Sequence, residues 1–381
     1  MLGIYIHVPF CEKVCDYCDF RVMPASSSNL FYEYTDLLVR EMEGFARANP
    51  GALETAETLY LGGGTPSLLP GDCLVRVFDS LRGFGVDVSR LREVTMEFNP
   101  ESCNGSTVAL ARECGVGRFS LGLQSFRSEI LERIGRRHSV EVGLRALELL
   151  CSQSGIEVNG DLMFNLPGQS VELFLGDLER LAGFPLNHVS FYGLTVAGRT
   201  RLGHRIARGE LSVDEDLYGE MYLRGVELLQ QKGFERYEVS NFCRDGRRSI
   251  HNINYWERGE YIGFGPGAHS YFRGMRFNAP EIYPRWREFV CNGMPRSGLS
   301  LDALTPDDIW TERVWLSMRQ NTGLDLEKLR AEGVELPESC YAKWIENGCL
   351  VQDSGRLRLA GRGWLLMDTI VTDVLNGYIP N

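Results

Sequence analysis

The sequence predicts an α/β fold: a partial (β/α)6 TIM-like barrel, followed by a small, mainly helical, winged-helix-like C-terminal domain. Six short segments rich in apolar and β-branched residues alternate with segments of helical periodicity in the N-terminal half of the chain. Such an alternation is typical of parallel strands covered by helices. Unusual motifs follow the first four segments, and in barrels functional groups gather at the carboxyl ends of the strands. A doubly wound open sheet is the structural alternative.

The predicted strands are short apolar runs bounded by turn residues. They cover residues 3–8, 58–63, 93–98, 118–123, 155–164 and 188–194. Apolar residues at helical spacing lie between them, most clearly over residues 30–45 and 140–150. A helix over 214–232 then leads to two more strand-like segments, 234–242 and 261–272. We therefore expect six strand–helix units with an extension.

The sequence after about residue 295 predicts a separate small domain. Several helical patterns surround one hairpin, at 349–363, that turns at 353–355. This combination resembles a winged helix, but a fold does not imply a function, and the helical segment 338–348 has one Lys against two Glu. We expect a packing or lid domain. The predicted parts are the barrel at 1–235, an extension at 236–295 and the C-terminal domain at 296–381.

The composition limits the classes of function. The 381 residues carry a formal net charge of −11, which disfavours nucleic acid or an anionic membrane as the main partner. No cationic leader precedes the first strand, and no run approaches the roughly 18 apolar residues that span a bilayer. We expect a cytoplasmic protein with no nucleic-acid partner.

Three of the eleven cysteines are clustered: Cys11, Cys15 and Cys18 form a CxxxCxxC motif directly after the first predicted strand. A disulfide framework is not expected in a reducing compartment. A [4Fe–4S] cluster normally takes four thiolates, so three would leave one iron open to another ligand. Zinc would need a fourth donor, for which His7 is the nearest candidate, and three inert buried cysteines are the remaining alternative.

A glycine-rich segment, LGGGTPS at 61–67, follows the second predicted strand. Consecutive glycines let backbone groups approach a ligand closely, because no Cβ is in the way. Alone, such a run is typical of many tight turns. It gains weight from its place beside the cysteine motif at the carboxyl ends of neighbouring strands.

The cysteine motif in this position resembles the hallmark of the radical S-adenosylmethionine (SAM) superfamily, and Tyr17 fits the same pattern. The resemblance implies a [4Fe–4S] cluster on Cys11, Cys15 and Cys18, whose open iron binds the methionine part of SAM. It also implies reductive cleavage of SAM to a 5′-deoxyadenosyl radical, for which the protein supplies position and a dry cavity. An electron donor for the cluster is then an expected partner.

The resemblance extends to the coproporphyrinogen III oxidase-like branch of that superfamily. YIHVPFC, GGGTPS, EFNPES, LGLQSF, IGRRH, DLMFNLPGQ and YEVSNF follow the order of motifs in this branch. The residues implied by position to contact SAM are Tyr5, Tyr17, Gly63, Gly64, Thr65, Glu97, Gln124, Arg136 and Asp161. Glu97 and Asp161 can accept hydrogen bonds from ribose hydroxyls or the ammonium group, and Arg136 can pair the carboxylate. Asn165 replaces the usual glycine of the branch, and Asn tolerates a left-handed backbone, so we expect the turn to survive.

Two features favour the heme chaperones of this branch, the HemW family, over its oxygen-independent oxidases. The oxidases carry a fourth cysteine where this chain has Phe20. HNINYW at 251–256 matches the HNxxYW motif of the chaperones and precedes GFGPGAHS. An imidazole can ligate heme iron, and Tyr and Trp can pack on a porphyrin face. The residues implied to bind heme are His251, Asn252, Tyr255 and Trp256.

Within that set, His251 is the expected iron ligand and His269 the reserve candidate. The ordinary alternative is a hydrogen-bonded loop histidine beside two interface aromatics. The resemblance implies a protein that binds heme and delivers it to acceptor proteins, among them respiratory proteins at the membrane. The alternatives are an enzyme, either coproporphyrinogen III oxidase or a radical-based heme-modifying enzyme, and a winged-helix regulator with a redox-sensing cluster.

Overall fold

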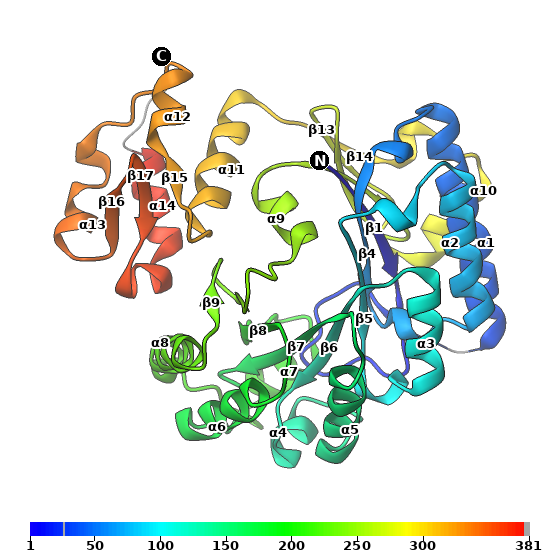
Figure 1. The fold of residues 1–381 in the computed structure, drawn as a ribbon, viewed down its shortest axis with the longest axis horizontal. Helices are drawn as coiled ribbons and strands as arrows, with labels where there is room; N and C mark the ends of the chain where they lie inside the picture. The colour runs from blue at the N-terminus through cyan, green and yellow to red at the C-terminus, as the bar shows by residue number, and fades with distance from the viewer. Residues whose placement is uncertain (26, 377–381) are drawn as a thin grey trace.

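A curved sheet of twelve strands forms the centre of the computed structural model, which describes residues 1–25 and 27–376 (Figure 1). Six neighbouring strands are parallel and match the predicted ones. They are β1 (Leu2–Val8), β4 (Ala56–Gly63), β5 (Glu93–Phe98), β6 (Arg118–Gln124), β7 (Glu157–Phe164) and β8 (His188–Gly193). The expected partial (β/α)6 barrel is confirmed.

Additional strands extend the sheet beyond both ends of the parallel arc. β11 (Glu260–Phe264) pairs parallel with β1, and three antiparallel strands follow it: β12 (His269–Phe272), β13 (Met275–Asn278) and β14 (Ser300–Ala303). Beyond β8 lie the antiparallel strands β10 (Asn241–Cys243) and β9 (Glu235–Arg236). The sheet is therefore open, with β14 and β9 at its edges.

Helices cover the outer face of the curve, as Figure 1 shows for α1, α2, α3, α5 and α6. In α1, Tyr34, Leu38 and Met42 are fully buried at a spacing of four residues, so one apolar stripe faces the sheet. The helices of this region are α1 (Ser28–Ala48), α2 (Gly71–Gly83), α3 (Gly105–Cys114), α4 (Ser128–Arg133), α5 (Val140–Cys151), α6 (Val171–Ala182), α7 (Arg201–Ala207), α8 (Asp216–Gln231) and α10 (Tyr283–Cys291).

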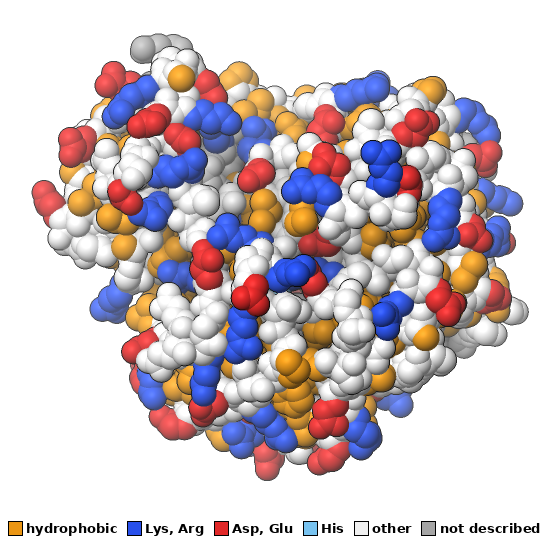
Figure 2. All heavy atoms as spheres, in the orientation of Figure 1, with side chains coloured by type: hydrophobic (Ala, Val, Ile, Leu, Met, Phe, Trp, Pro, Cys, Tyr) orange, Lys and Arg blue, Asp and Glu red, His pale blue; other side chains and the backbone are white. Residues whose placement is uncertain are grey.

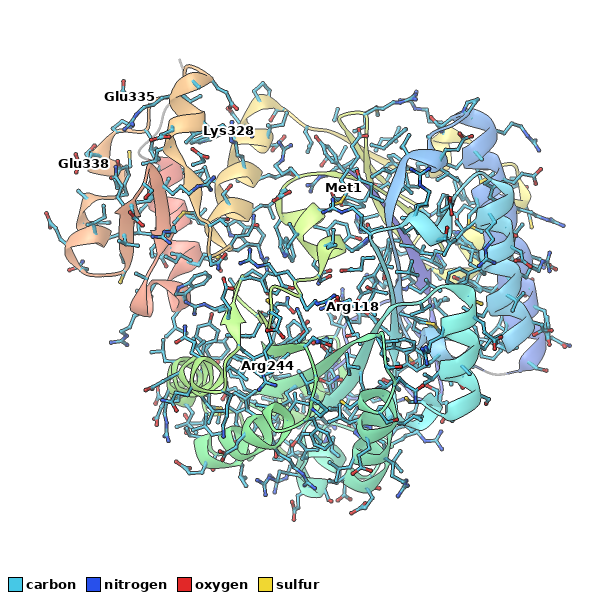
Figure 3. All side chains as sticks on the ribbon, in the orientation of Figure 1. Met1, Arg118, Arg244, Lys328, Glu335 and Glu338 are labelled. Carbon is cyan, nitrogen blue, oxygen red and sulfur yellow. The ribbon has the colours of Figure 1, made fainter. Side chains whose placement is uncertain are left out.

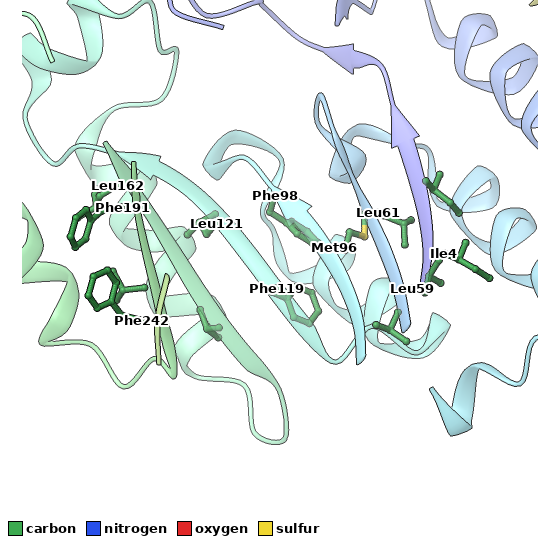
Figure 4. Packing of buried hydrophobic residues seen from close by; sticks show 14 of the residues in the cluster. Ile4, Leu59, Leu61, Met96, Phe98, Phe119, Leu121, Leu162, Phe191 and Phe242 are labelled. Atoms are coloured by element: carbon green, nitrogen blue, oxygen red, sulfur yellow. The ribbon is translucent and has the colours of Figure 1, made fainter. Parts of the chain in front are cut away.

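The apolar core is continuous from strand to strand (Figure 4). Ile4, Leu59 and Phe119 come from three different strands and have no exposed surface. At the far end of the arc, the rings of Phe191 and Phe242 stack with 4.8 Å between their centroids. This packing fixes the strands, and so fixes the positions of the side chains at their carboxyl ends.

Polar side chains fill much of the inside of the curve. Arg118, labelled in Figure 3, is almost completely buried there and donates to Glu157 over 2.6 Å. The His188 ring is hydrogen-bonded to Asn159 at 2.7 Å and to the Tyr237 hydroxyl at 2.8 Å. Both nitrogens of His188 are thus paired, and Arg118 is paired through Nη1, whereas its buried Nη2 has no partner among the described residues. Such hydrogen bonds reduce the energetic cost of a polar interior.

A short helix inside the curve, α9 (Ile250–Trp256), contains the HNxxYW motif (Figure 1). Ser249 caps it, and the Glu93 carboxylate from β5 accepts hydrogen bonds from the backbone N–H groups of Ile250 (2.6 Å) and His251 (3.2 Å). These bonds satisfy amides that have no partner within the helix. The motif is therefore a helix held by the barrel interior rather than a loop.

The residues after β14 form a small, mainly helical C-terminal domain, as expected, and β15 extends its hairpin to a three-stranded sheet. Its helices are α11 (Pro306–Met318), α12 (Leu326–Ala331), α13 (Ala342–Glu346) and α14 (Met367–Asn376). Its strands are β15 (Leu324–Asp325), β16 (Leu350–Asp353) and β17 (Arg356–Leu359), the last two forming the predicted hairpin. The three-part division at residues 235 and 295 stays a prediction.

The surface carries mixed charge. On the face in Figure 2, basic and acidic side chains are interspersed, and this face has no basic stripe of the kind that binds nucleic acid. Within residues 1–25 and 27–376, no helix has both the length and the apolar character needed to cross a membrane.

Candidate functional site

The clustered cysteines lie on a loop whose base is closed by two short parallel strands, β2 (Phe10–Cys11) and β3 (Met23–Pro24). The Ala25 N–H donates to the Cys11 carbonyl over 2.9 Å. In the middle of the loop, the Asp16 N–H donates to the Ile134 carbonyl (3.0 Å), and the Asp16 carbonyl accepts from the Leu202 N–H (2.7 Å). The loop is thus fixed at its base and at its tip.

Hydrogen-bond donors face two of the three thiols. The Thr65 hydroxyl lies 3.7 Å from the Cys11 sulfur, and Arg136 Nη1 lies 3.6 Å from the Cys15 sulfur. Burial raises the pKa of the Cys11 thiol to about 11, and burial also raises that of Cys18. Because thiolates are the metal-binding form, these thiols would have to release protons on binding a metal.

This donor set fits an iron–sulfur cluster better than a zinc ion. Among the described residues, no three His, Cys, Asp or Glu side chains are placed to hold one metal ion. A cluster takes one thiolate at each iron, so its ligands stand farther apart than the ligands of a single ion. His7 does not complete a zinc site, because its ring is hydrogen-bonded to the Tyr5 hydroxyl (3.1 Å) and the Arg21 carbonyl (3.3 Å). Arg136 Nε is buried without a partner among the described residues, beside the cysteine loop.

The glycine motif crosses the start of the cysteine loop. The Gly64 N–H donates to the Val8 carbonyl over 2.7 Å, and a Cβ on Gly64 would lie 2.5 Å from the Phe10 carbonyl oxygen. Gly63 has φ +108°, a conformation that side chains disfavour. The close approach predicted from the glycines is therefore present, and it joins the second strand to the cysteine loop.

Glu97, next to last in β5, is the central carboxylate of the predicted SAM residues. It accepts hydrogen bonds from the Tyr60 hydroxyl (2.7 Å) and from the Gly63 N–H (3.1 Å). Burial raises the pKa of the Glu97 carboxyl to about 7, against the lowering effect of the Tyr60 hydrogen bond. Tyr5 lies beside Tyr60, with 6.1 Å between ring centroids. Glu97 can therefore change its charge near neutral pH.

The next strands contribute the other predicted SAM residues. Asp161 on β7 accepts hydrogen bonds from the Ser120 hydroxyl (3.0 Å) and the Asn159 amide (2.7 Å), and burial raises its pKa. Gln124 ends β6 in a left-handed conformation, with φ 67°. Asn165 follows β7 with φ 59°, so the expected tolerance of Asn at this turn is confirmed.

Arg136 and Tyr17 join the cysteine loop to the sheet. Arg136 Nη2 donates to Asn99 Oδ1 over 3.1 Å and also contacts the Gly122 carbonyl. Its Nη1 lies 3.6 Å from the Cys15 sulfur, and the buried Tyr17 side chain lies beside the same sulfur. The predicted SAM residues thus come together at the carboxyl ends of β1, β4, β5, β6 and β7.

The predicted heme residues do not all face one space. His251 has no exposed surface, and its Nδ1 is hydrogen-bonded to the Thr58 hydroxyl at 2.8 Å. Its Nε2 is hydrogen-bonded to the Tyr255 hydroxyl at 2.7 Å. Burial lowers the pKa of His251 to about 3, so the ring is neutral. In this conformation neither nitrogen of His251 is free to bind iron, and the ordinary alternative of a hydrogen-bonded histidine describes its surroundings.

A cavity of about 630 Å³ connects the two predicted sites. Tyr5, Gly63 and Glu97 line it on the SAM side, and Tyr255 and Trp256 line it on the α9 side. Asn252 and His251 are not among its lining residues. Phe20 lies at its rim with 71% of its surface exposed. Volumes of 300–1,000 Å³ are usual for small-molecule and cofactor sites.

Sequence motifs missed several residues of this cavity. Arg258 and Arg276 line it, and both form ion pairs with the same oxygen of Glu312, at 3.1 and 3.0 Å. His269, previously a reserve candidate, also lines it, together with Tyr271. The signal for Arg276 is the register of the β12–β13 hairpin, which the sequence alone does not fix.

Comparison with known families divides the chain into two matched regions. Residues 5–181 match the radical SAM superfamily, and residues 304–366 match the HemN C-terminal domain.

Several curated proteins are similar over most of the chain. The heme chaperone HemW of Mycobacterium tuberculosis (strain H37Rv) is 36% identical over 376 residues, covering 98% of this chain and 94% of that protein. HemW of Lactococcus lactis is 30% identical over 372 residues, with 96% and 95% covered. HemW of Escherichia coli is 35% identical over 269 residues, with 71% and 70% covered.

Among solved structures, coproporphyrinogen III oxidase (HemN) from Escherichia coli superposes with a TM-score of 0.85. The identity is 21%, and the match covers 98% of this chain and 89% of that chain. At this identity the likeness shows a shared fold, from the barrel through the C-terminal domain.

Proposed function

This chain belongs to the radical SAM superfamily and, within it, to the HemW family of heme chaperones, and we propose that it binds heme and delivers it to acceptor proteins. Membership of the superfamily implies a [4Fe–4S] cluster and SAM. The observation that carries the proposal is the cavity that joins the residues predicted for SAM to those predicted for heme. A ligand in this cavity would contact both sites.

Cys11, Cys15 and Cys18 would hold the cluster, and when bound it can supply an electron to SAM. Thr65 and Arg136 then act on the thiolates, because a hydroxyl and a guanidinium at sulfur stabilise negative charge there. Glu97, Asp161 and the backbone at Gly63 offer acceptors and close approach to the polar groups of SAM.

The affinity for SAM should depend on the charge of Glu97. Its carboxyl has a pKa near 7 without ligand, and the ionised form is the better acceptor from ammonium and hydroxyl groups. Binding should therefore strengthen as pH rises through 7, by about tenfold between pH 6 and pH 8. Glu97→Gln should bind more weakly at pH 8, and the difference from wild type should shrink toward pH 6.

Calorimetric titration of SAM into the reconstituted protein and the Glu97→Gln variant, from pH 6 to 8, measures this effect. Since the amino group of SAM titrates equally in both experiments, the ratio of the two affinities isolates Glu97. A ratio that stays constant over this range would exclude Glu97 ionisation from SAM binding.

The proposed acceptors are heme proteins, including respiratory proteins at the membrane. The support for heme delivery is the name heme chaperone, which relatives matched over most of their length carry. The exposed ring of Phe20 at the cavity rim is consistent with transfer, because a heme entering or leaving the cavity would pass an apolar surface there. An electron donor for the cluster is a further proposed partner.

A direct test is to reconstitute the cluster anaerobically and to titrate heme and coproporphyrinogen III separately. We expect a saturable Soret band with heme at one equivalent per chain, and no conversion of coproporphyrinogen. Formation of protoporphyrinogen with consumption of SAM would instead establish the oxidase alternative. Absence of a saturable Soret change would contradict heme binding.

A further inference from the structure

We infer that the cavity takes an iron porphyrin with the His269 imidazole on the metal and the propionates on the Arg258–Arg276 pair. This inference rests on the proposed heme function and names the residues that would bind the iron and the propionates. It differs from the sequence-based expectation, in which His251 is the ligand.

Only two of the six histidines line the cavity, His7 and His269. Both ring nitrogens of His7 are hydrogen-bonded, to the Tyr5 hydroxyl and to the Arg21 carbonyl. The exposed ring of His269 forms no hydrogen bond with any described residue. An iron ligand needs a nitrogen that is free and accessible, and His269 has one.

The other candidate, His251, lies one layer behind the cavity wall. Tyr255 lines the cavity, and its hydroxyl is the partner of His251 Nε2. On its other side, His251 is bonded to Thr58, and a Cβ on Gly3 would lie 3.1 Å from its ring. Its ring is also 5.2 Å from that of Tyr60, which donates to Glu97. His251 therefore positions α9 and Tyr255 against β1 and β4.

The β12–β13 hairpin places the imidazole and one arginine on the same face. His269 and Tyr271 are two residues apart on β12, so their side chains point to the same side. Tyr271 is the cross-strand partner of Arg276 on β13, which therefore shares that side. Diagonal neighbours in such a pair are ~7–8 Å apart. A porphyrin whose iron lies at His269 could thus place its propionate edge toward Arg276.

The two arginines carry an uncompensated charge. They share a single carboxylate, Glu312, so the three side chains have a net charge of +1. Arg276 Nε is buried and has no partner among the described residues. By contrast, the other two arginines of the cavity each have an acidic partner of their own: Arg21 pairs with Glu281 and Arg199 with Asp19. A dicarboxylate ligand would balance the net charge of this pair and offer charge-assisted hydrogen bonds to its guanidinium groups.

The remaining walls suit a flat apolar ring. Tyr255 and Tyr261 pack edge to face, 4.6 Å between centroids, and Trp256 continues the wall. Aromatic faces of this kind pack well on a porphyrin. A ligand with an apolar plate, two carboxylates on one edge and a metal at its centre matches all three features of the cavity.

The iron ligand can be tested with and without the metal. We expect His269→Ala to weaken binding of iron protoporphyrin by roughly tenfold or more, since even indirect supports of a metal site contribute that much. The variant should also shift the Soret maximum. Metal-free protoporphyrin, which has no iron to ligate, should bind the variant and wild type equally. His204→Ala, at an exposed histidine that does not line the cavity, is the matched control.

The propionate contacts can be tested with heme and its dimethyl ester. Wild type should bind heme more tightly than the ester by roughly tenfold, because charge-assisted hydrogen bonds are lost with the ester. Arg276→Met should reduce heme affinity to that of the ester and leave ester affinity unchanged. Arg273→Met is the control, since Arg273 lies in the turn of the same hairpin but does not line the cavity.

The outcomes separate the inference from the proposed function. If wild type does not bind heme, the proposed function fails. If wild type binds heme, but His269→Ala keeps its affinity and Soret maximum while His251→Gln loses both, the ligand is His251 and the inference is overturned. If His269→Ala loses affinity for metal-free and iron protoporphyrin equally, ligation of the iron by this residue is likewise excluded. Unchanged heme affinity in Arg276→Met would overturn the propionate assignment.

Discussion

Cys15→Ser is expected to abolish the iron–sulfur centre, lowering the iron content after anaerobic reconstitution from about four atoms per chain to near none. A serine hydroxyl does not ionise at neutral pH, and it is a poor ligand for iron. The Arg136 contact at 3.6 Å is also lost with the sulfur. Two remaining thiolates would leave two irons without protein ligands. The measurements are iron analysis and the brown absorbance of the cluster.

Cys291→Ser is the matched control for this prediction. Cys291 is exposed at the end of α10, far along the chain from the cysteine loop. The Cys291→Ser variant should take up as much iron on reconstitution as wild type. The loop anchors at Asp16 do not involve the Cys15 side chain, so thermal unfolding of the cluster-free Cys15→Ser variant should match that of cluster-free wild type. Undiminished iron in Cys15→Ser would show that the ligand assignment is wrong.

The parallel arc could be predicted from the sequence because each of its strands is a distinct apolar run. The place of β11 beside β1 could not, since this pairing joins segments more than 250 residues apart and leaves no local signal. The left-handed residue Asn165 was predictable from its residue type, as Asn favours that conformation. Gln124 also has a positive φ, although glutamine does not favour that conformation, so the tertiary structure imposes it.

The SAM side of the site was likewise predictable, because carboxyl ends of parallel strands must meet at one edge. Tyr5, Gly63 and Glu97 do line one cavity. The heme side was less predictable, since a motif does not state which helix face it buries. In α9, His251 is buried in the barrel interior, whereas Tyr255 lines the cavity. The SAM and heme roles of these residues remain proposals.

The joint between the barrel and the C-terminal domain is the other place where a large effect is expected. Glu238 has no exposed surface and accepts hydrogen bonds from Arg319 Nη2 (2.9 Å) and Nε (3.3 Å). Its other oxygen accepts from the Ser240 N–H (2.8 Å) and the Asn241 amide (2.6 Å). A single carboxylate thus pairs one buried cation and two further donors.

Arg319 also connects this pair to the HNxxYW motif. Its guanidinium carbon lies 3.8 Å from the centroid of the Trp256 ring, a cation–π geometry. The neighbouring Gln320 amide donates to the Trp256 carbonyl over 3.2 Å. The C-terminal domain therefore contacts the motif directly, and the orientation of Trp256 depends on how that domain is docked.

We expect Glu238→Ala to lower the free energy of unfolding by about 3–5 kcal/mol, because it leaves a largely buried guanidinium uncompensated. Urea unfolding followed by circular dichroism measures this. Glu43→Ala, which breaks an exposed pair with Arg47, should cost at most about 1 kcal/mol. The double variant Glu238→Ala/Arg319→Met should recover part of the loss, since no unpaired charge then remains. Equal stability of Glu238→Ala and Glu43→Ala would mean that the apolar contacts between the domains, and not this buried pair, hold the joint.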